Sequence, residues 1–288
     1  MKQPGVLILP AAYDCMSARI VEKVGCKAVF LSPGMTCDAQ LSMPNIGLST
    51  SSELINCAKY MANSVNIPLI MGADDGFGSA LAAYRTTQEA IGAGIAGIII
   101  SDQKNLIPVK TPHNLAEVVP RDEYLGKIGA VLEARNKKDK DFIIVARIDA
   151  GATMGDEEVI IRAKACVKLG VDMILPHAVP FESKFKQKDK EGLSRFYKLL
   201  GAPDVLIWWG MAPQGFTAKD CEDIEAKVWV PPASPMDAVK KVLFDVYQEV
   251  RDTGNYTPLK GVTLDKDFSK HLRGKEFWRE LEKKYVPN

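Results

Sequence analysis

Short apolar segments with the composition of buried strands recur eight times along the 288 residues, and most of them are followed by a stretch with helical spacing. The apolar segments are residues 6–9, 28–31, 67–71, 95–100, 142–146, 171–175, 205–207 and 228–230. Strands that alternate with helices are typical of parallel sheets, and eight such units at this chain length favour a closed (β/α)8 barrel of the α/β class. A doubly wound open sheet is the alternative, but no GxGxxG motif opens the first helix.

Helical periodicity fills much of the chain between these segments. The expected helices are residues 16–24, 52–64, 80–93, 122–136, 157–169, part of 184–200, 236–251 and 266–285. No repeat and no linker divides the sequence, so we expect one barrel domain over residues 1–288, with 236–288 as a C-terminal helical extension. Residues 104–120 carry three prolines and no periodicity, which is typical of a functional loop such as a lid.

The composition excludes several classes of function. A net charge of +1 gives no reason to expect nucleic acid or a membrane surface as a partner. No apolar run approaches the roughly 20 residues of a membrane-spanning helix, and the apolar run at the N-terminus is too short for a signal peptide. The six cysteines form no CxxC pair and no zinc-like spacing, which indicates reduced thiols in a cytoplasmic protein.

An acidic, glycine-containing turn follows the third apolar segment. Asp74 and Asp75 follow two residues after the expected strand, and Gly76 and Gly78 allow the backbone to turn sharply into the next helix. Ligands bind at the carboxyl ends of the strands in parallel α/β folds, so the turn indicates a site for a small charged substrate. The alternative is that one of the two acids only caps the helix.

In a barrel, the residues just past each strand share one face of the molecule. They are Tyr13 and Asp14, Ser32 to Gly34, Asp74 and Asp75, Ser101 to Gln103, Arg147 and Asp149, His177, Trp208, and Ser234. Arg147 suits bidentate binding of a substrate carboxylate or phosphate. Its alternative is a structural ion pair with Asp149 or Asp102 at the barrel rim.

Two histidines belong to the candidate chemistry. His177 follows a strand and is either a general acid or base or a neutral hydrogen-bonding wall of the site. In the predicted lid, Lys110, Thr111 and His113 are the reactive groups that lie close together, although such loop residues are often simply solvated.

Several segments, in order, match a known family. They are Pro-Ala-Ala-Tyr-Asp at 10–14 with Ser-Ala-Arg at 17–19, Lys-Ala-Val-Phe-Leu-Ser at 27–32, Ala-Asp-Asp-Gly-Phe-Gly at 73–78, Gly-Ile-Ala-Gly-Ile at 94–98 with Asp-Gln at 102–103, and residues 141–150. With these segments the chain resembles the isocitrate lyase and phosphoenolpyruvate mutase superfamily. The resemblance is to its short members in particular: methylisocitrate lyase, dimethylmalate lyase, oxaloacetate hydrolase and phosphonopyruvate hydrolase.

The resemblance implies a barrel whose last helix swaps onto a neighbouring subunit, within a homotetramer built as a dimer of helix-swapped dimers. It also implies cleavage of a C–C or C–P bond next to a 2-oxo or 2-hydroxy carboxylate. In the family, Mg2+ and the backbone amides of a Ser-Gly-Gly turn stabilise an enolate. That turn is Ser32-Pro33-Gly34 here, and Pro33 has no N–H to donate.

The metal ligands are the largest departure from the family. Its four acidic positions correspond to Asn45, Gly72, Asp74 and Ser101, so Asp74 is the one acid that remains, and Asp75 is one residue out of register. Because Mg2+ requires hard oxygen ligands and gains affinity from their charge, we expect the metal requirement to be altered or absent.

Other departures concern the lid and the substrate pocket. Thr111 falls where the lyases carry a catalytic cysteine, and His177 falls where lyases carry a Glu and the mutase branch a His. Trp208 falls at a carboxylate-binding Asn of many members, which suggests a smaller or less polar ligand.

The sequence therefore predicts a C–C bond lyase, or a related enolate-type enzyme, for a small 2-hydroxy or 2-oxo acid, with no nucleotide cofactor. The expected catalytic residues are Arg147, His177, Thr111, His113 and Asp74. The expected substrate-binding residues are Tyr13, Ser32, Pro33, Gly34, Asp102, Arg147 and Trp208. The alternatives are a phosphonopyruvate-type C–P mutase or hydrolase and a catalytically silent relative that binds a small acid.

Overall fold

The protein is described by a computed structural model. The described residues are 5–104, 117–176, 194, 198–201, 206–207, 215–231, 235–255 and 265–286. They fall into two compact units, Met1–Ala233 and Ser234–Asn288, which are treated separately below.

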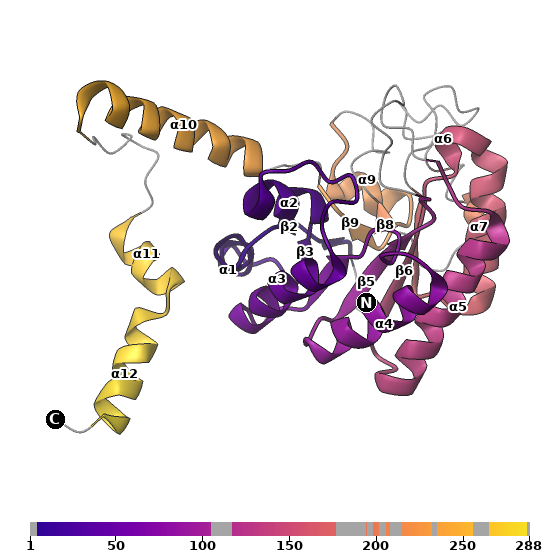
Figure 1. The fold of residues 1–288 in the computed structure, drawn as a ribbon, viewed down its shortest axis with the longest axis horizontal. Coiled ribbons are helices and arrows are strands. Elements are labelled where there is room, and N and C mark those ends of the chain that lie inside the picture. The colour runs from indigo at the N-terminus through magenta and orange to yellow at the C-terminus, as the bar shows by residue number, and fades with distance from the viewer. Residues whose placement is uncertain are drawn as a thin grey trace. The chain divides into compact units, whose positions relative to one another are not determined.

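The first unit is the predicted α/β barrel, seen from one side in Figure 1. Its strands are β1 (Leu7–Ile8), β2 (Ala11–Ala12), β3 (Val29–Leu31), β4 (Leu69–Gly72), β5 (Gly97–Ser101), β6 (Ile143–Ile148), β7 (Met173–Pro176), β8 (Leu206–Ile207) and β9 (Val228–Trp229). All pairings are parallel, in the orders β2-β3-β4-β5-β6-β7 and β1-β9-β8. The two pieces β1 and β2 of the first strand join the orders, because Leu9 N donates to Trp229 O at 2.8 Å and Phe30 N donates to Pro10 O at 2.9 Å.

The apolar strand residues are divided between two packed layers. In β5, Ile98 and Ile100 belong to the cluster beneath the surrounding helices, whereas Ile99 belongs to the cluster that also holds Phe30 and Val145. Successive side chains of a strand point to opposite faces, so a strand buried on both faces reads as an unbroken apolar run. This is why the strands could be recognised in the sequence without an alternating pattern.

The helices cover the outside of the strands. They are α1 (Cys15–Lys23), α2 (Pro33–Leu41), α3 (Ser51–Ser64), α4 (Ala80–Gly92), α5 (Arg121–Lys138), α6 (Gly151–Met154), α7 (Asp156–Leu169) and α9 (Ala218–Asp223). Five of them match expected helices; α2, α6 and α9 were not expected. In Figure 1, α4, α5 and α7 lie side by side against the sheet. At the base of the predicted lid, Lys104 N donates to Glu117 O at 2.8 Å, so the loop begins and ends at one place.

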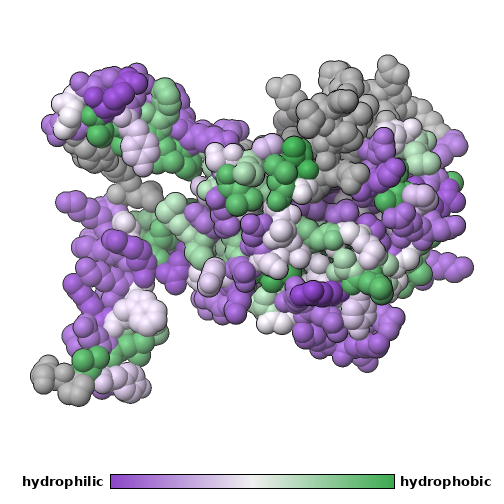
Figure 2. Space-filling view, in the orientation of Figure 1, coloured by the Kyte–Doolittle hydropathy of each residue, from purple (hydrophilic) through white to green (hydrophobic). Residues whose placement is uncertain are grey.

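The second unit consists of helices α10 (Pro235–Thr253), α11 (Lys266–Leu272) and α12 (Lys275–Tyr285). The single helix expected over 266–285 is wrong, because the chain breaks at Gly274, which has a φ of 62°. Figure 2 shows hydrophobic groups at the surface of these helices among hydrophilic ones. Within the described part of the chain, no helix has the length and hydrophobicity needed to cross a membrane.

Candidate functional site

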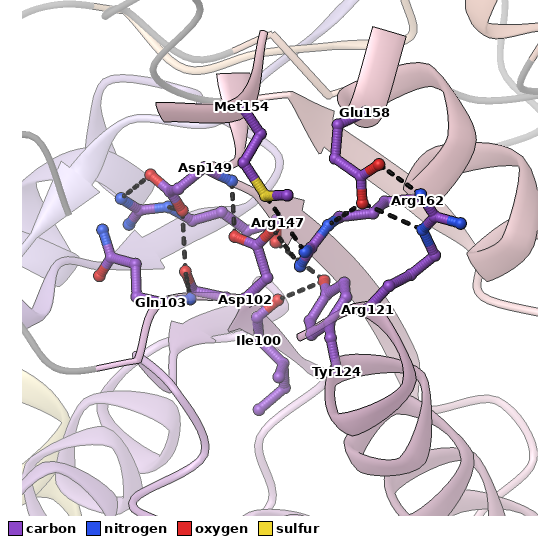
Figure 3. A network of polar contacts seen from close by, with 11 residues as sticks. Ile100, Asp102, Gln103, Arg121, Tyr124, Arg147, Asp149, Met154, Glu158 and Arg162 are labelled. Carbon is purple, nitrogen blue, oxygen red and sulfur yellow. Dashed lines mark hydrogen bonds and ion pairs between the residues drawn. The ribbon is translucent and has the colours of Figure 1, made fainter. Parts of the chain in front are cut away.

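The polar side chains predicted from the strand ends gather at the carboxyl ends of β4, β5 and β6. Asp74 follows β4, Ser101 and Asp102 close β5, and Arg147 and Asp149 lie at the end of β6. Figure 3 shows Arg147, Asp149 and Asp102 directed toward one another, with a second set of charged residues from α5 and α7 beside them. In a parallel barrel this edge is where ligands bind.

Arg147 and Asp149 form a bidentate ion pair. Arg147 Nε donates to Asp149 Oδ2 at 2.8 Å, and Arg147 Nη2 donates to Asp149 Oδ1 at 2.9 Å. Ser101 Oγ donates to the same Oδ2 at 2.8 Å. Burial lowers the pKa of Arg147, but the carboxylates of Asp149, Asp74 and Asp102 together raise it above its ordinary value. The ion pair left open as an alternative is therefore present, and it fixes the plane of the guanidinium while about a fifth of the Arg147 side chain stays exposed.

A second arginine, Arg162, is linked to this pair through Asp102. Asp149 N donates to Asp102 Oδ1 at 2.7 Å, and Arg162 Nη1 donates to Asp102 Oδ2 at 3.1 Å. Asp102 is completely buried, and burial together with the Asp149 carboxylate raises its pKa. Both Asp102 oxygens thus accept hydrogen bonds within the protein. Asp102, predicted to bind substrate, holds the backbone of Asp149 in this structure.

The same network continues to the surface along α7. Arg162 Nε donates to Glu158 Oε1 at 2.9 Å, and Glu158 also pairs with the partly exposed Arg121 (Figure 3). Tyr124 Oη lies 2.8 Å from Arg147 O, so its hydroxyl supports the end of β6. Arg162 was not among the predicted site residues. The available signal was its position four residues after Glu158, between the apolar Val159 and Ala163 of the buried helix face.

Asp74 has a carboxylate oxygen without a partner in the part of the chain described here. The side chain is 6% exposed, Asn45 Nδ2 donates to Oδ1 at 3.4 Å, and Oδ2 accepts no hydrogen bond there. Burial raises the pKa of Asp74 to about 6, against the opposing effects of Asn45 and Arg147. Its φ of 44° is in the left-handed region, which costs energy for a residue other than glycine and is common at functional sites.

The turn after Asp74 is held by its own contacts. Asp75 accepts from Phe77 N at 2.9 Å, and the buried Lys127 Nζ donates to Asp75 O at 3.1 Å. The alternative that Asp74 or Asp75 caps the next helix is wrong, because Ser79 is the N-cap of α4. Gly76 meets the predicted need for glycine, since its φ is 86° and a Cβ there would lie 2.7 Å from Ala83 Cβ.

The predicted anion-binding turn is the N-terminus of α2. Ser32 is the N-cap, with its hydroxyl accepting from Met35 N at 3.4 Å, and Pro33 is the first helical residue. Gly34 lies beside Asn45, since a Cβ on Gly34 would be 3.9 Å from Asn45 Cβ. The turn therefore borders the Asn45–Asp74 pair. A serine followed by proline is a known helix-start signal, and it could have revealed α2 in the sequence.

Tyr13 lies just before α1. Asp14 caps that helix by accepting from Ser17 N at 2.7 Å, and the Tyr13 side chain is 5% exposed. Burial, and then the neighbouring Asp14, raise the pKa of the Tyr13 phenol. Tyr13 would therefore meet a ligand as a neutral hydroxyl.

The four positions that the resemblance implies as metal ligands carry groups that do not fit Mg2+. Asn45 directs its NH2 group to Asp74 and its oxygen to Cys37 Sγ at 3.7 Å. Ser101 Oγ donates to Asp149 and accepts from Gln103 N at 3.1 Å. Gly72 has no side chain, and the described residues contain no group of three or more His, Cys, Asp or Glu able to hold a metal ion. One carboxylate oxygen is far from the set of hard ligands that Mg2+ requires.

Six of the candidate residues lie outside the described residues. They are Lys110, Thr111 and His113 of the lid, His177, Trp208 and Ser234. Their roles stay predictions.

The chain is similar to known proteins over most of its length. A family model described as phosphoenolpyruvate phosphomutase matches residues 1–249. The 2-methylisocitrate lyase of Bacillus subtilis (strain 168) is 30% identical over 258 residues, which cover 88% of this chain and 80% of that protein. The chloroplastic carboxyvinyl-carboxyphosphonate phosphorylmutase of Arabidopsis thaliana is 30% identical over 291 residues, which cover 99% of this chain and 82% of that protein.

Solved structures share the fold along nearly the whole chain. Oxaloacetate acetylhydrolase in complex with the inhibitor 3,3-difluorooxalacetate superposes with a TM-score of 0.85 at 23% identity, covering 99% of this chain and 94% of that one. Phosphonopyruvate hydrolase in complex with oxalate and Mg2+ superposes with a TM-score of 0.82 at 24% identity, covering 98% and 95%. With the family model spanning most of the sequence, the chain belongs to the phosphoenolpyruvate phosphomutase family, within the isocitrate lyase and phosphoenolpyruvate mutase superfamily.

Proposed function

We propose that the chain is a C–C bond lyase for a small 2-hydroxy or 2-oxo carboxylic acid and that it works without a tightly bound divalent metal. The observation that carries this proposal is the buried Asp74 Oδ2, which accepts no hydrogen bond from the described residues, at the same strand ends as the Arg147 guanidinium. A proton acceptor and a carboxylate-binding cation at one edge of the sheet are what cleavage of a 2-hydroxy acid requires. Similarity to 2-methylisocitrate lyase supports the same substrate class.

For a 2-hydroxy acid, the cleavage runs as a retro-aldol step. Asp74 takes the proton of the C2 hydroxyl, the C2–C3 bond breaks, and C2 becomes the carbonyl carbon of a 2-oxo acid. The electron pair of the broken bond moves to C3, where the attached carboxylate holds it as an enolate until an acid protonates it. Arg147 binds the C1 carboxylate, and Ser32 with the Gly34 amide faces the developing oxyanion. The proton donor is His177 or the lid residues His113 and Thr111.

The proposal is tested by incubating the purified protein with 2-methylisocitrate, 2,3-dimethylmalate and oxaloacetate and following the products by proton NMR. Parallel reactions contain excess EDTA or added Mg2+ or Mn2+. We expect turnover of at least one of these acids, with a rate that EDTA does not abolish. Tight Mg2+ binding that activates turnover, measured by isothermal titration, would contradict the metal part of the proposal.

A second candidate is chemistry at a C–P bond, because one relative, whose match covers 99% of this chain, is a carboxyvinyl-carboxyphosphonate phosphorylmutase. Phosphonopyruvate followed by 31P NMR separates the two reactions, since only C–P cleavage or transfer moves the phosphorus signal. If no acid is turned over and none raises the melting temperature, the chain is the catalytically silent relative.

We also propose a cytoplasmic homotetramer in which the helices of residues 236–288 swap between subunits. The support is the apolar surface of this unit, where Tyr247, Phe277, Trp278 and Tyr285 are each more than 60% exposed. Surfaces of this kind are usually covered by another chain. Light scattering of the full chain should give four times the subunit mass, and removal of residues 236–288 should lower that mass to a smaller assembly.

A further inference from the structure

Gly72, the last residue of β4, lies against the ring of Pro33. A Cβ at position 72 would be 2.5 Å from Pro33 Cδ and 2.6 Å from Pro33 Cγ, and Phe30 Cζ would lie 3.4 Å away. Carbon atoms in packed interiors approach to about 3.5–4.0 Å. The backbone does not itself require glycine here, because the φ of Gly72 is outside the positive range. The absence of a side chain at position 72 is therefore a matter of space.

The proline ring has little room to move away. Pro33 is buried as the first residue of α2, where the N-cap Ser32 precedes it. Its ring fixes φ near −65°, so the Cδ and Cγ atoms move only with the backbone of the helix. Phe30, which closes the other side of the space, is 2% exposed in the barrel interior.

We propose that Pro33 and Gly72 form one steric unit that closes the metal-ligand position at residue 72. The proline ring fills the volume in which a side chain at position 72 would begin, so that position can carry no carboxylate while residue 33 is proline. The inference deepens the proposed function, and its link to metal rests on that function. According to this inference, the metal-ligand position at residue 72 can be restored only if Pro33 and Gly72 are both replaced.

Denaturant and thermal unfolding of three variants test the steric unit without any substrate. G72A alone should lower the unfolding midpoint by roughly 3–9 °C, as overpacking does, or prevent folding. P33A removes Cγ and Cδ and should change the midpoint little, and P33A/G72A should recover most of the loss caused by G72A. A G72A protein as stable as the natural one, or a double variant that is no better than G72A, would overturn the proposal.

Metal binding tests the consequence. In P33G/G72D the carboxylate has room and lies near Asp74, whereas P33G/G72N has the same shape without the charge. We expect Mn2+ at millimolar concentration to raise the melting temperature of P33G/G72D, and to bind it in electron paramagnetic resonance titrations, but to do neither for P33G/G72N. A folded P33G/G72D protein that does not bind Mn2+ would overturn the link to the metal position.

These results are separable from the fate of the proposed function. The stability series needs neither metal nor substrate, so it can succeed even if the natural protein turns over no acid. Conversely, turnover of an acid in EDTA would support the proposed function but would not test the steric unit. The unfolding midpoint of G72A tests that unit.

Discussion

Arg162 and Asp102, 60 residues apart in the chain, form a salt bridge with Nη1 3.1 Å from Oδ2 and both side chains 1% exposed or less. Replacing Arg162 by Leu would leave the Asp102 charge buried without its partner. Removal of one member of a buried pair costs about 3–5 kcal/mol. We expect Arg162→Leu to lower the free energy of unfolding by that amount, as measured by urea denaturation.

Arg121 provides the matched control for Arg162, because both side chains bind Glu158. Arg121 is 42% exposed, and its pair with Glu158 lies at the surface. Exposed pairs contribute roughly 1 kcal/mol or less, so Arg121→Leu should change the unfolding free energy by no more than that. Equal losses in the two variants would mean that the buried network does not support the site in the way described.

Arg147→Lys tests the bidentate pair with Asp149. Lysine presents a single charged point on a flexible stem and cannot bind a carboxylate through two parallel N–H groups. We expect kcat/KM for the acid substrate to fall about 100-fold, largely through KM, with a small change in melting temperature. Arg135→Lys is the control, because Arg135 pairs with Asp172, away from the strand ends, and its kinetics should match those of the natural protein.

The residues at the carboxyl ends of the strands could be predicted from the sequence. The contacts between their side chains could be predicted only in part. The apolar run at 95–100 identified β5, and a parallel barrel then brings Asp102 and Arg147 to one edge. The orientation of Asp102 could not be deduced, because it depends on Arg162 from a helix whose buried face looks like any other amphipathic face.

The pairing of Pro33 with Gly72 illustrates the same limit. Both departures from the family are visible in the sequence, but they are 39 residues apart and fall after different strands. Only the parallel pairing of β3 with β4, which sets Leu31 opposite Met71, brings the two residues together. The register alone could have indicated that the two residues are neighbours, whereas the 2.5 Å between Pro33 Cδ and a Cβ added at position 72 could not be derived from the sequence.

Asp74→Asn should separate function from stability. The pKa of Asp74 is raised from 3.8 to about 6, so the folded state holds this proton more tightly than the unfolded state. The stabilisation from that proton is present in full below pH 4 and is lost as the pH rises through 6. At pH 8 the buried charge therefore lowers the free energy of unfolding by up to about 3 kcal/mol. The variant lacks this charge, so its stability relative to the natural protein should rise by about 1.4 kcal/mol between pH 5 and pH 8.

The same variant should lose activity. A general base contributes roughly 100- to 10,000-fold to rate, so kcat should fall within that range while the substrate still binds at Arg147. Urea unfolding at both pH values and steady-state kinetics measure the two effects. A stability difference that does not change with pH would show that burial does not raise the pKa of Asp74. An unchanged kcat would show that Asp74 is not the general base.

Gly76→Ala tests the geometry of the turn that presents Asp74. Alanine would be forced to a φ of 86°, with its Cβ 2.7 Å from Ala83 Cβ, so we expect a loss of roughly 2–4 kcal/mol in unfolding free energy. Gly126→Ala is the control, because Gly126 lies within α5 and a Cβ there meets nothing within 4 Å. In a helix interior alanine is favoured over glycine by about 1 kcal/mol, so this change should stabilise the protein. Urea titrations should therefore show a lower unfolding free energy for Gly76→Ala and a higher one for Gly126→Ala. A Gly76→Ala protein that is more stable than the natural one would contradict the turn geometry.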